Sequence, residues 1–234
     1  MGRQEPHCTI CGPEAKGVFC TLTGAHLERL DREKVVHHYD RDDTIFHAGN
    51  SPLAIYCIYS GRVKLYKTGG RGEEQVIRLL GRGEILGYRA LLANEPYAAT
   101  AVALEPTTIC MVLKETLFDL LQQSPELAMR LMAKMARELR ASEELLVSQR
   151  ENTALERTAQ LLLWFYDNGH RSGVTPAKLR IPLSRSEMAH MVGATPETLS
   201  RMLRSLAGHG VLELKRREIW VCNANALRAF TRPR

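Results

Sequence analysis

The sequence predicts an α+β fold in three parts: an N-terminal double-stranded β-roll (jelly roll), a long helix and a C-terminal winged helix-turn-helix. Short β-rich runs separated by glycine turns occupy residues 34–113, a pattern typical of a small barrel or jelly roll. A helical block follows, and the last third contains two short helices broken at Gly193. These observations predict four segments. They are a cysteine-rich segment over 1–22, the β-roll over 23–124, the long helix over 125–152 and the winged helix-turn-helix over 153–234.

The first two parts differ in their hydrophobic patterning. Residues 1–22 form a cysteine-rich segment with little periodicity, and a brief helix is expected over 24–33. In the β-roll, strands are expected over 44–46, 54–60, 63–67, 74–80, 100–103 and 107–112. A short helix over 114–123 then leads to the long one.

The long helix is expected to start at Ser124-Pro125-Glu126. Along it a stripe advances by alternating steps of four and three residues, through Ala128, Met132, Met135, Leu139, Ser142 and Leu146. This is about three heptads of a coiled-coil seam, which favours a homodimer with Met132, Met135, Leu139, Ser142 and Leu146 at its interface. The same stripe could instead pack on the chain's own β-roll, because seams and core-facing stripes overlap at this length.

Two helix starts lie close together near the C-terminus. Ser184 and Glu187 have the spacing of a capping box, Gly193 supplies a turn, and Thr195-Pro196 begins a second helix. That helix has an apolar side of Leu199, Met202, Leu203 and Leu206 and a polar side of Glu197, Ser200, Arg201 and Arg204. The pattern favours a helix-turn-helix whose polar side reads bases over an ordinary hairpin with a solvated charged face.

Positive charge is concentrated in the same region. Strands expected over 211–214 and 218–221 flank the basic turn Lys215-Arg216-Arg217 and form a wing. From Arg171 to Arg234 the sequence holds twelve Lys or Arg and four Glu, a charge of +8 against +6 for the whole chain. Binding to nucleic-acid phosphates requires such a distribution.

Other classes of protein find little support in the sequence. No apolar run approaches the length of a membrane span, and the N-terminus lacks the apolar core of a signal peptide, so a cytoplasmic protein is expected. In that compartment its six cysteines are expected to be free, catalytic or metal-bound rather than disulfide-paired. No catalytic triad, phosphate-binding glycine loop or metalloprotease motif is present, and we expect no enzyme.

The order of these parts resembles the CRP/FNR family of bacterial transcription regulators. The most specific segments are Leu183-Ser-Arg-Ser-Glu-Met-Ala with Thr198-Leu-Ser-Arg, and the strand–turn Tyr56-Cys-Ile-Tyr-Ser-Gly-Arg-Val-Lys-Leu-Tyr. The resemblance covers nearly the whole chain. It implies a transcription regulator that binds double-stranded DNA as a homodimer and contacts RNA polymerase.

The resemblance also bears on what the β-roll senses. The cyclic-nucleotide branch offers an arginine and a serine to the cyclic phosphate, whereas this chain has Pro96-Tyr97-Ala98-Ala99 there, so no cyclic nucleotide is expected. The FNR branch holds a [4Fe–4S] cluster, one thiolate per iron. Its ligands match Cys8, Cys11, Cys20 and Cys110, although the gap from Cys11 to Cys20 is longer than in the best-known FNR proteins.

Alternatives to the cluster remain open. Four thiolates also suit structural zinc, in which His7 or His26 could replace a cysteine, or plain thiol-based redox sensing. Cys57 lies mid-strand and Cys222 follows the last wing strand, so both are interpreted as small buried hydrophobes rather than ligands. His37-His38 is interpreted as a solvated strand end rather than a haem site.

The second helix of the helix-turn-helix supports the same branch. Glu197-x-x-Ser200-Arg201 resembles the FNR-type triad that reads TTGAT half-sites in a palindrome. Arg201 can donate two hydrogen bonds to guanine, and Glu197 can accept one from cytosine. Phosphate contacts are expected from Arg204 and Lys215 to Arg217, with Arg185 as a further DNA contact. The resemblance thus implies an oxygen- or nitric-oxide-responsive regulator whose intact cluster favours the dimer and DNA binding.

Overall fold

The computed structural model describes residues 6–8, 17–70, 72–151, 153–169, 176–216 and 218–231, without the side chains of residue 21 and residues 145–151. Cys11, Arg217 and the side chain of Leu146 therefore lie outside the described residues. The chain divides into two compact units, Met1–Arg140 and Ala141–Arg234. This division falls within the long helix, whereas the sequence predicts a boundary at each of its ends. Within the described ranges, every helix is too short or too polar to cross a membrane.

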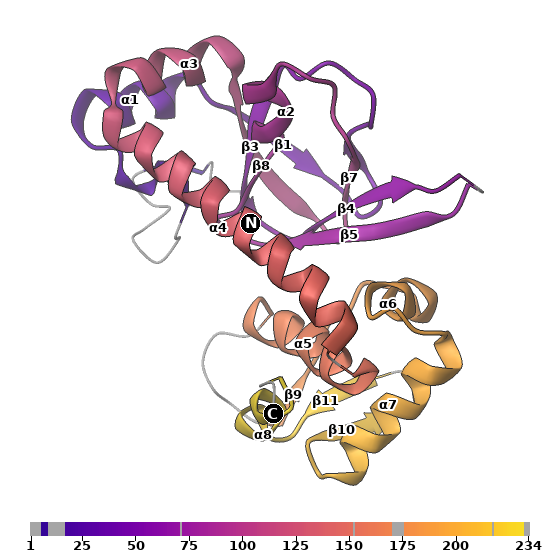
Figure 1. Ribbon diagram of the computed structural model, residues 1–234. Helices are drawn as coiled ribbons and strands as arrows, with labels where there is room; N and C mark the ends of the chain where they lie inside the picture. The colour runs from indigo at the N-terminus through magenta and orange to yellow at the C-terminus, as the bar shows by residue number, and fades with distance from the viewer. Residues whose placement is uncertain are drawn as a thin grey trace. The chain divides into compact units, whose positions relative to one another are not determined.

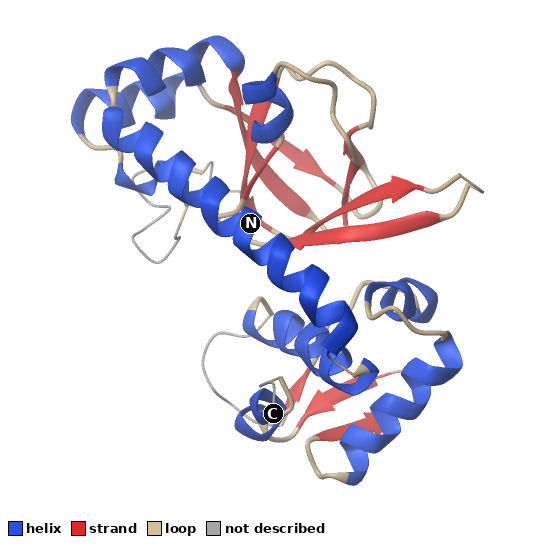
Figure 2. Ribbon diagram, viewed as in Figure 1, coloured by secondary structure: helices blue, strands red, loops and turns tan. Residues whose placement is uncertain are grey.

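The first unit contains the β-roll that the sequence predicts. Two four-stranded antiparallel sheets have the strand orders β1-β8-β3-β6 and β2-β7-β4-β5 (Figures 1 and 2). The strands are β1 (Val35–Tyr39), β2 (Thr44–Phe46), β3 (Ala54–Ser60), β4 (Val63–Thr68), β5 (Glu74–Leu80), β6 (Ile85–Leu86), β7 (Thr100–Ala103) and β8 (Thr107–Leu113). The six strand predictions are confirmed to within a residue at their ends.

The sequence pattern does not predict three elements of this unit. β1 lies at a sheet edge, so most of its side chains are partly exposed and show no strict alternation. β6 has two residues, and α2 (Tyr88–Ala93) has six; both are too short to establish a period. These elements form because of strand pairing and tertiary packing, and not because of the conformational preferences of their own residues.

Gly61 shows why one turn needs glycine. It joins β3 to β4 with φ +90°, a left-handed conformation that L-residues rarely adopt. A Cβ at this position would lie 2.3 Å from the Thr107 hydroxyl oxygen and 2.7 Å from its Cα. The glycine therefore lets the hairpin approach the start of β8.

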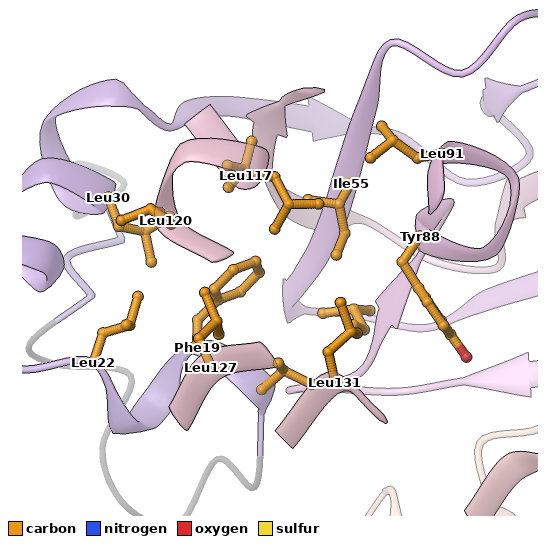
Figure 3. Packing of buried hydrophobic residues seen from close by; sticks show 13 residues of the cluster. Phe19, Leu22, Leu30, Ile55, Tyr88, Leu91, Leu117, Leu120, Leu127 and Leu131 are labelled. Atoms are coloured by element: carbon orange, nitrogen blue, oxygen red, sulfur yellow. The ribbon is translucent and has the colours of Figure 1, made fainter. Parts of the chain in front are cut away.

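Two apolar clusters hold the unit together. One lies between the sheets, where the rings of Phe46 and Tyr97 stack with their centroids 4.0 Å apart. The other joins β3, β6 and β8 to the helices (Figure 3). Its helical members come from η1 (Val18–Thr21), α1 (Gly24–Glu33), α2, α3 (Lys114–Gln123) and α4 (Pro125–Glu151). We call the second group the helix-side core.

The long helix α4 has two different faces within the first unit. Leu127 and Leu131 are 1% and 3% exposed and belong to the helix-side core, as Figure 3 shows. Two turns further on, Glu138 accepts hydrogen bonds from Arg78 of β5 and Tyr88 of α2. The predicted seam lies on a different side of the helix, where Met132, Met135 and Leu139 are exposed.

The second unit is a winged helix-turn-helix. Its sheet has the strand order β10-β11-β9, formed by β10 (Leu212–Lys215), β11 (Glu218–Val221) and β9 (Ala177–Lys178). Around it lie α5 (Ala154–Asp167), α6 (Arg185–Met191), α7 (Pro196–Gly208) and α8 (Ala224–Ala229). The two-stranded wing is confirmed, whereas the short β9 and α8 were not predicted.

Candidate functional site

Asp31 of α1 organises the described part of the cysteine-rich segment. Its carboxylate accepts a hydrogen bond of 2.7 Å from the Cys8 backbone N–H. It also pairs with His7 at 3.0 Å and with the ammonium group of Lys34. Burial opposes ionisation of Asp31, but these hydrogen bonds outweigh it and hold the pKa of the carboxyl well below its usual range. The Cys8 backbone is thereby tied to the folded body of the unit.

The Cys8 thiol lies in surroundings that favour its protonated form. Burial is the main cause, and it raises the pKa of the thiol to about 12. Asp31 and Cys110 act in the same direction, and Lys34 opposes them. A thiolate at Cys8 would therefore need a cation beside it, as a metal ligand has.

Cys20 is positioned by the short helix η1. Val18 and Phe19 directly precede it and are buried in the helix-side core. A Cβ on Gly17 would lie 3.2 Å from the Cys20 sulfur and 3.0 Å from the Gly83 carbonyl oxygen. Cys20 thus lies near the loop that leads into β6.

Cys110 is 6% exposed on β8. In the β-sheet register it lies opposite Val36 of β1 on one side and Cys57 of β3 on the other. Sequence reasoning set Cys57 aside as a core residue, and it does pack against the helix-side core. What the pattern missed is that its direct cross-strand neighbour is a predicted ligand.

Three of the four predicted ligands, Cys8, Cys20 and Cys110, lie in the described part of the first unit. Cys8 packs against the helix-side core, Cys20 directly follows its member Phe19, and Cys110 lies two residues from its member Val112. Soft thiolates in an apolar surrounding suit an iron–sulfur cluster or zinc. Within the described residues, no three His, Cys, Asp or Glu side chains are close enough to hold a metal ion. The chemistry of the three described thiols suits such a group, but Cys8, Cys20 and Cys110 do not come together as a metal site in the described part of the chain, and Cys11 lies outside it.

The helix-turn-helix has the local structure that its sequence predicts. Ser184 and Glu187 form the complete capping box at the start of α6, and the Thr195 hydroxyl accepts a hydrogen bond from the Thr198 N–H at the start of α7. Gly193 adopts φ +59° in the turn. Beside it, the guanidinium of Arg157 on α5 donates a hydrogen bond of 2.7 Å to the Val192 carbonyl. This last contact, which the sequence did not indicate, ties the turn to α5.

The predicted DNA contacts lie on the exposed side of the second unit. Leu199, Leu203 and Leu206 of α7 are buried, which turns the opposite side of the helix outwards. Ser200 is partly exposed, and the exposed predicted contacts are Arg185, Glu197, Arg201, Arg204, Lys215 and Arg216. The Arg201 side chain is exposed on that side of α7.

The wing presents less charge than its sequence indicates. Lys215 pairs with Glu213 of the same strand at 2.8 Å, and its ammonium lies 5.2 Å from the centre of the Trp220 ring. Arg216 occupies the turn with φ +53°. Lys215 would therefore have to exchange its acidic partner for a phosphate when DNA binds.

Family models match both parts of the chain. A model described as "Cyclic nucleotide-binding domain" covers residues 36–124, and one described as "Crp-like helix-turn-helix domain" covers residues 156–230. Together they span the β-roll and the helix-turn-helix.

Individual proteins are similar over nearly the whole chain. The fumarate and nitrate reduction regulatory proteins of Salmonella typhi and Escherichia coli K12 are each 28% identical, over 96% and 94% of this chain and 90% and 88% of their own lengths. The structure of Thermus thermophilus catabolite activator protein is 31% identical, with a TM-score of 0.51, over 92% of this chain and 97% of that one. The structure of FixK2 from Bradyrhizobium japonicum has a TM-score of 0.71 and 26% identity, over 85% of this chain and 98% of that one.

Proposed function

The chain belongs to the CRP/FNR family of DNA-binding transcription regulators, which are not enzymes, and on that premise we propose that it senses oxygen or nitric oxide through a [4Fe–4S] cluster. The proposed ligands are Cys8, Cys11, Cys20 and Cys110. The observation that carries the proposal is that Cys8 packs against the helix-side core, Cys20 directly follows its buried member Phe19, and Cys110 lies two residues from its member Val112 on β8. The relatives named as fumarate and nitrate reduction regulatory proteins support it.

The cysteine-rich segment is coupled to α4 through the helix-side core. When bound, the cluster would supply a centre that oxygen or nitric oxide can damage. Cys20 follows Phe19 directly, and Phe19 is buried in the same cluster as Leu127 and Leu131 of α4. A change in the position of Cys20 would therefore alter the packing beneath α4, because well-packed interiors transmit small displacements.

The exposed face of α4 is the proposed dimer interface. Met132, Met135 and Leu139 are 53%, 41% and 63% exposed, and Met129 extends the stripe at 63%. Four large apolar side chains in one row on a single helix favour pairing with a second copy. Ser142 is exposed beside them, and Leu146 remains a predicted member of the interface.

The dimer would read a TTGAT-type palindrome through α7. Arg201 and Glu197 are the proposed base-reading residues, with Ser200 beside them. Arg185, Arg204, Lys215 and Arg216 are proposed to hold phosphates, which set the position of the protein without reading sequence. RNA polymerase is the proposed protein partner, and a cytoplasmic location follows from this function.

A cyclic nucleotide is not the proposed ligand. The segment that should offer an arginine and a serine contains Tyr97, which is 5% exposed and stacks on Phe46 between the sheets. Its hydroxyl donates to the Ala54 carbonyl at 3.4 Å. Tyr97 thus serves the core and offers no cationic group to an anion.

The visible absorption of anaerobically purified protein tests the cluster. A brown protein that bleaches in air is expected, and Cys8→Ser and Cys110→Ser variants should lose the absorption while Cys222→Ser keeps it. A colourless protein with one tightly bound zinc per chain would establish a structural zinc site instead. A colourless, metal-free protein with unchanged DNA binding would leave thiol-based sensing as the remaining mechanism.

A further inference from the structure

Two cysteines lie opposite each other on neighbouring strands of one sheet of the β-roll. Cys57 of β3 and Cys110 of β8 are paired residues in an antiparallel ladder. Their neighbours Ile55 and Val112, also a cross-strand pair, both belong to the helix-side core. Because side chains two positions apart lie on one face of a strand, the two thiols point to the same side of the sheet.

The strand pairing places the two residues at nearly the separation that a disulfide requires. Directly opposed residues in antiparallel strands have Cα atoms about 4.5 or 5.5 Å apart, and disulfides span about 4.4–6.8 Å. Their Cβ atoms lie about 4.5–5.5 Å apart, whereas a disulfide prefers about 3.8 Å. A bond is therefore within reach if the strands close slightly, and that strain makes it easier to reduce than a structural disulfide.

The two thiols also differ in access. Cys57 is partly exposed, and Cys110 is buried. An oxidant such as hydrogen peroxide would therefore reach Cys57 first, and Cys110, its cross-strand partner, is placed to resolve the product. Cys222, on the second unit, is partly exposed like Cys57 and serves as a control.

We propose that Cys57 and Cys110 form a reversible disulfide when the cluster-free protein meets peroxide. The Cys57 thiolate attacks one peroxide oxygen to give a sulfenic acid, and hydroxide leaves. The Cys110 sulfur then attacks the Cys57 sulfur, an S–S bond forms, and the sulfenic oxygen leaves as water with the Cys110 proton. The two sulfurs lose two electrons in total, and the peroxide gains them.

The consequence for sensing rests on the proposed function. A disulfide to Cys57 removes Cys110 from the cluster's ligand set, so the protein could not rebuild its cluster until a thiol reductant reopened the bond. While the cluster is bound, Cys110 is occupied and the disulfide cannot form. Cys57 thus acts as a lock on cluster reassembly after oxidative damage, and not as a ligand.

Peptide mapping of the full-length, cluster-free protein tests the bond itself. Trypsin should release Cys57 within residues 42–62 and Cys110 within residues 90–114, each as the one cysteine of its peptide. After peroxide treatment and alkylation, these two peptides should appear joined, and free thiols should fall by two of the six. Cys222→Ser should behave in the same way, and the link should be absent from Cys57→Ser and Cys57→Ala. Cys110 joined instead to residues 4–16 or 17–29, which carry Cys8, Cys11 and Cys20, would overturn the proposal.

Anaerobic reconstitution with iron and sulfide tests the lock. Peroxide-treated wild-type protein should recover its visible absorption only after dithiothreitol, whereas treated Cys57→Ser and Cys57→Ala should recover it directly. Equal loss in all three would refute the lock. If untreated protein never takes up a cluster, the proposed function fails. The peptide mapping still tests the disulfide independently.

Discussion

Single carboxylates hold separate parts of the first unit together. Asp31 ties the backbone of Cys8 to α1, and Glu138 ties α4 to β5 and α2. Glu138 accepts from Arg78 at 2.7 Å and also pairs with Lys134. Its side chain is 19% exposed, so the ion pairs are largely shielded from water. At this scale, Arg78 and Tyr88, neither of them a predicted ligand or base contact, hold α4 against the β-roll through Glu138.

Replacing Glu138 with Gln should weaken folding by about 2 kcal/mol at pH 7. Although burial opposes ionisation, the partners of Glu138 lower its pKa from 4.5 to about 2. The ionised form is therefore stabilised by folding, and the contribution is complete above pH 4.5 and lost as the pH falls towards 2.

Urea unfolding of both proteins between pH 3 and pH 7 measures this effect. The difference between them should shrink steadily on acidification. Glu126→Gln is the matched control, because Glu126 is 69% exposed and pairs with Arg130 on the same helix at 3.6 Å. It should change stability by less than about 0.5 kcal/mol. If the difference in unfolding free energy between wild-type protein and Glu138→Gln did not change with pH, the packing of the side chain rather than its charge would be responsible for the stabilisation.

Arg201→Ala should cost about 1–3 kcal/mol of binding to the palindrome and relax discrimination at one base pair, because a bidentate contact to guanine would be lost. Arg204→Ala is the comparison: its side chain lies one turn along α7 and is proposed to hold a phosphate. It should weaken binding to specific and random DNA alike and reduce the salt dependence. Titrations at two salt concentrations separate the two, and equal losses from Arg201→Ala on both DNAs would place Arg201 on a phosphate.

At the scale of elements, local sequence signals were a good guide where they were long or chemically specific. The capping box at Ser184 and the glycine turn at Gly193 lie where the sequence predicted them. The short elements β6, β9 and α8 were missed because two to six residues establish no period. The stripe on α4 left two possibilities open, and the structure shows that different residues, Leu127 and Leu131, pack on the β-roll.

Leu139→Glu should therefore shift the protein towards monomer, with dimerisation weakened by at least about tenfold, or 1.4 kcal/mol. Two carboxylates would be forced together at an apolar seam. Sedimentation equilibrium measures the change. Ala141→Glu places the same charge about 200° around the helix and should leave the dimer intact. Unchanged association of Leu139→Glu would move the interface elsewhere.

At the scale of the whole molecule, the proposed function requires that the state of the cysteine-rich segment reach α4. The helix-side core provides one continuous packed route from η1 to α4 within the first unit. The second unit carries the DNA-reading helix and begins within α4. The long helix is therefore the covalent link between the proposed sensor and the proposed reader.

Phe19→Ala should uncouple the cluster from DNA binding. It removes a ring that is 7% exposed and leaves a cavity beside Leu127 and Leu131, at a cost of about 3 kcal/mol in stability. The cluster-loaded variant should bind DNA no more tightly than the cluster-free protein. Phe19→Leu, which keeps most of the volume, should retain the difference. Gel-shift titrations of loaded and cluster-free samples give the comparison, and an unchanged ratio in Phe19→Ala would exclude this route.

The sequence by itself determined the order of the parts, the caps and turn of the helix-turn-helix, and most strands of the β-roll. These features depend on periodicity and on preferences of neighbouring residues, which a single chain displays directly. It also identified Cys110 as a thiol of interest, but it could not say what lies beside it.

Only the tertiary structure decided which distant residues meet. Cys57 lies opposite Cys110 because the pairing of β3 with β8 sets that register, and a shift by one residue would turn either thiol to the other face of the sheet. In the same way, Glu138 meets Arg78 and Phe19 shares a core with Leu127 only because the unit folds as a whole. Such contacts join positions tens of residues apart, and no local pattern encodes them.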